Sequence, residues 1–68
     1  MPRDPARIEE LTSLVEEVWK LDPDLRLGQL ILNAARLQGG EHIDVGGIED
    51  GALLKGLHRY RDLILGKR

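Results

Sequence analysis

The sequence of 68 residues contains no cysteine, so neither a disulfide framework nor a cysteine-based zinc site can stabilise it. A chain this short buries only about 60% of the surface that its unfolded form exposes. Association with itself or with another protein is the ordinary remaining source of stability, and we expect this chain to associate. The absence of cysteine also fits a reducing compartment.

Long hydrophobic runs are absent as well. Residues 1–5 lack the apolar run of a signal peptide. No stretch approaches the roughly 20 apolar residues that span a bilayer, and the apolar runs are no longer than the one at residues 30–32. We therefore expect a cytoplasmic protein with no membrane partner.

Side chains for nucleophilic catalysis are scarce. Thr12 is the only threonine and Ser13 the only serine, and neither is followed by the sharp turn of a nucleophile elbow. No glycine-rich phosphate-binding motif is present, and the pairs Gly39-Gly40 and Gly46-Gly47 are typical of turns. The sequence therefore predicts no catalytic residue and a protein that is not an enzyme.

Apolar residues at three- and four-residue spacing predict three helices, at residues 5–20, 23–38 and 51–65, in a single domain of residues 1–68. Asp4-Pro5 is a typical helix start, because aspartate accepts hydrogen bonds from free backbone amides and proline has none to lose. The same dipeptide at 22–23 predicts the end of the first helix and the start of the second. Gly40 and the preceding glycine predict a left-handed stop, and Asp50 predicts the next start.

The turn between the first two helices is short, so we expect them to form a helical hairpin, joined to the third helix by an ordered glycine-rich loop. The fold class is thus all-α, a small three-helix domain. Within the loop we expect a short extended stretch at 42–45. Ile43, Val45 and Ile48 should attach the loop to the core. Gly56 should weaken the last helix by about 1 kcal/mol relative to alanine.

Most of the chain, from residue 7 to residue 62, resembles the YihD-like family of short, uncharacterised bacterial proteins. The most specific element is a tryptophan followed by Pro-Asp-Leu-x-Leu-x-Gln, here Trp19 and residues 23–29. The other shared residues are Arg7, Glu10, Ala35, Asp50, Leu53 and Leu57. The chain is shorter than the family at its C-terminus and differs from it in the glycine-rich loop at 39–47. The resemblance implies a compact helical protein without an established activity, and it transfers no catalytic residue.

The second helix carries more apolar surface than one stripe requires. Leu25 and Leu32 fall beside its main face, where a second copy or another partner would cover them. A neighbouring polar ridge, formed by Arg26, Gln29 and Asn33, either recognises a partner or bonds the loop at 39–50 and the helix ends, and we favour the second interpretation. Trp19 is either a core residue or an interface anchor. The candidate partner-binding residues are Trp19, Leu25, Arg26, Gln29, Leu32 and Asn33.

One cluster invites a metal-site hypothesis, namely Glu41-His42-x-Asp44 with Glu49 and Asp50 nearby. Its spacing matches neither a zinc motif nor a calcium loop. We interpret these side chains as solvated loop residues and helix caps, and we predict no metal and no other cofactor.

Two functions remain open. The first is a non-enzymatic protein–protein interaction module of unknown cellular role, for which self-association as a homodimer is the expected form. The alternative is a nucleic-acid-binding accessory protein that uses the basic last helix. Its candidate residues are Lys55, Arg59, Tyr60, Arg61, Lys67 and Arg68. The net charge of the chain is -2, which makes nucleic acid the less favoured partner.

Overall fold

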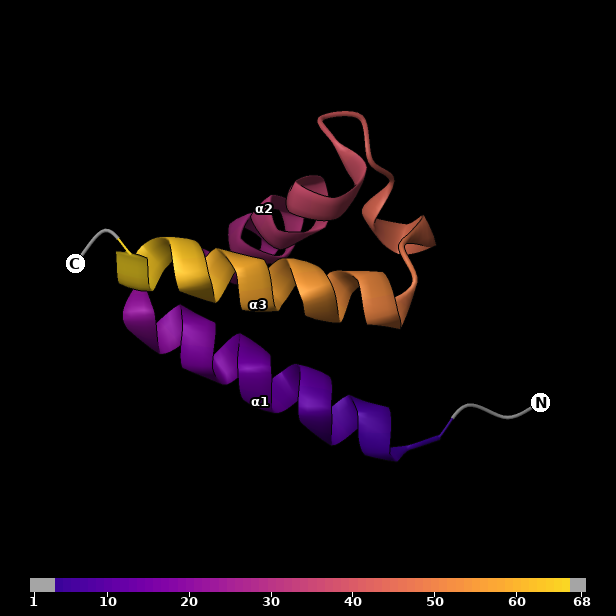
Figure 1. Ribbon diagram of the computed structural model, residues 1–68, viewed down its shortest axis with the longest axis horizontal. Coiled ribbons are helices and arrows are strands. Elements are labelled where there is room, and N and C mark those ends of the chain that lie inside the picture. The colour runs from indigo at the N-terminus through magenta and orange to yellow at the C-terminus, as the bar shows by residue number, and fades with distance from the viewer. Residues whose placement is uncertain (1–3, 67–68) are drawn as a thin grey trace.

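The computed structural model describes residues 4–66, which form three α-helices and one short 3₁₀ turn (Figure 1). These elements are α1 (Ala6–Leu21), α2 (Leu27–Gly39), η1 (Val45–Gly47) and α3 (Asp50–Gly66). No strand occurs within residues 4–66. The predicted all-α, three-helix class is confirmed.

The last helix, α3, holds the other two together. In Figure 1, α1 and α3 lie side by side and run in the same direction, whereas α2 crosses the opposite side of α3 at a steep angle. The backbones of α1 and α2 approach each other at few points, so the pairing differs from the expected hairpin. The turn at residues 22–26 is long enough to carry α2 away from α1 and onto α3.

The predicted start of the second helix at residue 23 is wrong, because α2 begins at Leu27. The amide of Leu25 donates to the carbonyl of Asp22 (3.2 Å), which closes a turn around Pro23. The carbonyl of Leu25 accepts from Nε1 of Trp19 (2.7 Å) and is thus used outside the helix. The next residue, Arg26, is extended, with φ −76° and ψ 149°. The Asp-Pro dipeptide therefore marks the turn rather than the helix start.

The other helix boundaries follow the predicted capping residues. A carboxylate oxygen of Asp4 accepts a hydrogen bond from the amide of Ala6 (2.9 Å) at the start of α1. Gly40 follows α2 with φ +86°, and its amide donates to the carbonyl of Arg36 (2.9 Å). Asp50 is the first residue of α3. The predicted glycine stop and Asp4 cap are thus present.

The core is a small cluster that draws on all three helices. Val18, Leu30 and Leu57, one from each helix, are fully buried, and Leu14 and Ala34 complete the cluster. Leu65, which the periodicity assigns to the apolar side of the last helix, is 47% exposed. Adjacent helical residues point about 100° apart, so only Ile64 of this pair packs against the core.

The loop between α2 and α3 contains the helical turn η1, which overlaps the expected extended stretch at 42–45 only at Val45, and Asp44 before it has an extended backbone (φ −86°, ψ 107°). The carboxylate of Asp44 accepts from the amide of Gly46 (3.1 Å) and caps η1. Ile43 is half-buried and packs on Gly39, and Ile48 is also half-buried. Val45 is 36% exposed, so its predicted attachment to the core is wrong, because the turn directs it to solvent.

Candidate protein interface

One face of α1 carries a groove of about 470 Å³ that we name the α1 groove. It is lined by Thr12, Val15, Glu16, Trp19, Lys20 and Pro23, and most of its surface is apolar. Among residues 4–66, those lining it belong to α1 and to the turn that follows. Neither α2 nor α3 fills this groove.

The α1 groove exists because α1 has two apolar stripes rather than one. Leu14 and Val18 lie on the stripe that packs into the core. Ile8, Thr12, Val15 and Trp19 follow one another at spacings of four, three and four residues, which places them on a second stripe. Ile8, at the start of that stripe, is 53% exposed. The spacing of this second stripe can be read from the sequence. It could have identified Thr12 and Val15, which line the groove but were absent from the predicted partner-binding residues.

Trp19 connects the two stripes of α1. Its half-buried indole packs against the core cluster, and its Nε1 donates to the carbonyl of Leu25. The same side chain lines the α1 groove. Trp19 is therefore both a core residue on one side of its indole and a residue open to a partner on the other.

The remaining predicted partner-binding residues do not share one surface with Trp19. Leu25 is half-buried against the core of its own chain, Leu32 is half-buried, and Arg26 is exposed. Gln29 donates to Asn33 Oδ1 (3.1 Å), and Asn33 Nδ2 donates to the hydroxyl of Tyr60 (3.1 Å). The polar ridge is thus hydrogen-bonded to α3 through Asn33. The prediction that it bonds the loop at 39–50 and the helix ends is wrong.

A second hollow, of about 300 Å³, lies where α2 meets α3. It is lined by Asn33, Arg36, Leu37, Tyr60, Leu63 and Ile64. Leu63 is 47% exposed beside it. This hollow was not predicted, because it depends on the crossing of α2 and α3, which the periodicity of neither helix contains.

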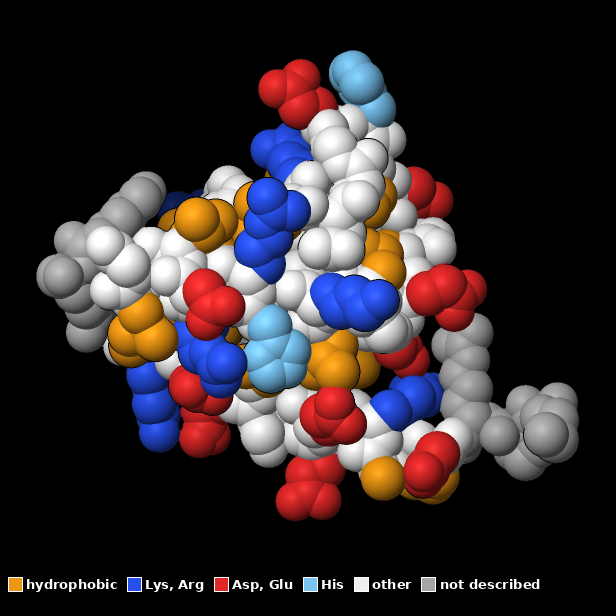
Figure 2. Space-filling view, viewed as in Figure 1, with side chains coloured by type: hydrophobic (Ala, Val, Ile, Leu, Met, Phe, Trp, Pro, Cys, Tyr) orange, Lys and Arg blue, Asp and Glu red, His pale blue; other side chains and the backbone are white. Residues whose placement is uncertain are grey.

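The two sides of the molecule differ in charge. Residues 4–24, which comprise α1 and its flanking turns, carry seven acidic and two basic side chains. Figure 2 shows acidic side chains along the lower edge, over α1, whereas elsewhere on this face Lys and Arg side chains are mixed with acidic ones. Residues 25–66 carry five acidic and five basic side chains. At the α1 groove, Lys20 pairs with Glu16 (3.3 Å), and both side chains are well exposed. The surroundings of the groove are therefore acidic.

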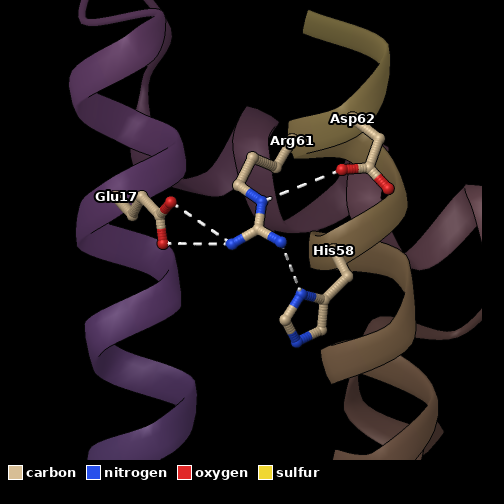
Figure 3. Close-up of polar contacts among 4 residues, drawn as sticks. All are labelled: Glu17, His58, Arg61 and Asp62. Carbon is tan, nitrogen blue, oxygen red and sulfur yellow. Dashed lines mark hydrogen bonds and ion pairs between the residues drawn. The ribbon is translucent and has the colours of Figure 1, made fainter. Parts of the chain in front are cut away.

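Arg61, one of the basic candidates on the last helix, is paired within the fold. Figure 3 shows Arg61 directed from α3 towards α1, where Nη1 lies 3.2 and 3.3 Å from the carboxylate oxygens of Glu17. Its Nη2 lies 3.2 Å from Nδ1 of His58 and donates to it, because a guanidinium has no acceptor. Nε of Arg61 also lies 3.9 Å from Oδ1 of Asp62. Lys67 and Arg68, named with this surface, lie outside the described residues.

The loop acids and His42 do not form a compact ligand set. Within residues 4–66, no group of three or more His, Cys, Asp or Glu side chains is placed to hold a metal ion. Asp44 is occupied with capping η1. In the same part of the chain, no helix is long and apolar enough to cross a membrane.

Comparisons with protein-family models, with curated proteins and with solved structures found no match. The resemblance to the YihD-like family therefore stays a prediction, and the chemistry of the surface carries the functional argument.

Proposed function

We propose that this chain is a non-enzymatic protein–protein interaction module that binds its partner along the α1 groove. The observation that carries the proposal is the position of Trp19, half-buried on the core and exposed to a mostly apolar groove. Tryptophan is enriched among residues that dominate binding energy, and a ring already held by the core loses little freedom on binding. We propose a cytoplasmic location, which the absence of cysteine supports.

The expected homodimer has less support than a complex with a different protein. Self-association was inferred from Leu25 and Leu32, yet Leu25 packs on the core of its own chain. Joining two copies through the α1 groove would also bring two acidic helices together. We therefore place a different protein ahead of a second copy as the partner.

The nucleic-acid alternative is also less supported. Two of its candidate residues have partners within the fold. Arg61 is paired with Glu17 on α1. Arg59 lies with Nη1 3.4 Å from the carbonyl of Leu37. Binding that falls steeply with salt and is lost in Arg59→Glu would favour this alternative.

Site-specific photo-crosslinking in cells tests the proposed function. A photoreactive residue at Thr12, in the α1 groove, should give one discrete adduct with a protein. The same residue at Glu10, exposed on the opposite side of α1, serves as the control and should give none. Equal adducts from both positions, or no adduct from either, would count against an interaction through this face.

A blocking substitution provides the second test. Thr12→Arg places a long side chain in the α1 groove without touching the buried core, and it should abolish binding of the partner identified by crosslinking. The control is Ser13→Arg, the same change one residue along on an exposed position that does not line the groove. If the two variants bind equally well, the α1 groove is not the interface.

A further inference from the structure

The charges beside the second stripe of α1 indicate what kind of chain fits the α1 groove: Glu16 lines the groove, and Glu9 lies about one turn before Thr12, where the groove begins. Glu9 and Glu16 are both exposed and lie seven residues apart, so they stand on the same side of the second stripe. Resting on the proposed function, we propose that the α1 groove binds an amphipathic helix of a different protein, whose apolar seam is flanked by Lys and Arg.

The apolar stripe argues for a helical occupant. Ile8, Thr12, Val15 and Trp19 are spaced by four, three and four residues, which is the spacing of a coiled-coil seam. Such a seam receives side chains from a facing helix that repeats in the same way, and an extended strand would not stay in register with it. The α1 groove lies along this seam from Thr12 to Pro23, which is about two to three helical turns.

The charges argue for a basic occupant. In a two-helix seam, residues beside the apolar positions choose the partner by charge, and here those positions include Glu9 and Glu16. Lys20 is the one cation among the groove residues, and it is already paired with Glu16. Lysine or arginine on an incoming helix would meet the carboxylates of Glu9 and Glu16. A second copy of α1 in antiparallel pairing would instead place Glu9 opposite Glu16.

Binding of designed peptides tests the inference. Three helical peptides would share one leucine seam and differ only in the flanking residues, which are lysine, glutamine or glutamate. Affinity is measured at low and high salt, with the binding site mapped by amide chemical shifts and by Trp19 fluorescence. We expect the lysine peptide to bind at least tenfold more tightly than the glutamine peptide, with the advantage shrinking as salt rises.

Charge reversal on the protein provides the matched control. The double variant Glu9→Lys with Glu16→Lys should reverse the order, so that the glutamate peptide binds best. The control double variant, Glu10→Lys with Glu41→Lys, makes the same change in net charge at exposed positions away from the groove and should keep the original order. Circular dichroism of both double variants establishes that each is folded.

Each other outcome overturns the inference. Equal binding of the three peptides would show that charge does not select the partner, and an equal effect of the two double variants would show that only net charge matters. Shifts mapped to the hollow between α2 and α3 would place the partner elsewhere. Concentration-dependent Trp19 emission of the protein alone, lost in Thr12→Arg, would make the occupant a second copy while leaving the interaction module intact. Failure of all peptides, with a Thr12 crosslink still observed in cells, would likewise overturn only the inference.

Discussion

Gly56 of α3 lies directly against the main-chain carbonyl of Ala34 in α2. Both residues are buried, and a Cβ at Gly56 would overlap the carbonyl oxygen of Ala34. The two helices can approach this closely only because one residue has no side chain and the other has a small one. The glycine that weakens α3 as an isolated helix is therefore what allows α3 to pack against α2.

Replacing Gly56 with alanine should lower the free energy of unfolding by roughly 1–3 kcal/mol, because the backbones must move apart. The matched control is Gly28→Ala in α2, where an added Cβ meets nothing within 4 Å. That change should raise stability by about 0.5–1 kcal/mol through helix propensity alone. Urea unfolding of both variants checks the opposite signs, and a stabilised Gly56→Ala would contradict this packing.

Trp19→Phe should loosen the turn at residues 22–26. The substitution removes the indole donor to the carbonyl of Leu25, at a cost of about 1–2 kcal/mol, and also some packing. Amide hydrogen exchange should rise in this turn more than in the loop at 40–49. Unchanged exchange would show that the hydrogen bond does not hold the turn.

Arg61→Glu should destabilise the fold, because it sets a third carboxylate beside Glu17 and Asp62. Glu17→Gln alone should cost only about 0.2–1 kcal/mol, since both partners are partly exposed. The exchanged pair, Glu17→Arg with Arg61→Glu, should recover most of the loss in thermal unfolding. This control is needed for binding experiments. If Arg61→Glu alone loses binding to a ligand, the loss can come from the destabilised fold rather than from a lost contact with the ligand.

Asn33 and Tyr60 should show energetic coupling across α2 and α3. Their hydrogen bond is part-buried, and a double-mutant cycle with Asn33→Ala and Tyr60→Phe should give about 0.5–1.5 kcal/mol. The matching cycle with Gln29→Ala and Tyr60→Phe should give a smaller value, because Gln29 reaches Tyr60 only through Asn33. A zero value for the first cycle would leave Asn33 available for recognition of a partner.

Gly40→Ala should be destabilising, in contrast to Gly28→Ala. Gly40 has φ +86° and ψ −175°, a conformation that costs a residue with a Cβ on the order of 1–3 kcal/mol. No atom lies within 4 Å of a Cβ at Gly40, so the cost is purely one of backbone conformation. Equal stability of the alanine variant would show that the end of α2 can relax.

Local chemistry along the chain was sufficient for the number, type and approximate position of the helices. The aspartate at position 4 and the glycine at position 40 act within a few residues, so their effects are readable without the fold. The start of α2 was mispredicted because the carbonyl of Leu25 is taken by the side chain of Trp19, six residues earlier. This side-chain hydrogen bond takes an acceptor that an earlier helix start would use, and helix propensities of single residues do not include it.

Which helix packs on which was decided by tertiary structure. Periodicity shows that a helix has an apolar face, but burial gains about the same free energy per unit of apolar area whichever neighbour covers that face. The order of packing was selected by specific fits, above all the approach of Gly56 to Ala34, and by the bond from Asn33 to Tyr60. The pattern of acidic and apolar residues along α1 can be read directly from the sequence. The second stripe stays partly open, with Val15 and Trp19 touching the core on one side and lining the α1 groove on the other, because α3 covers mainly the first stripe.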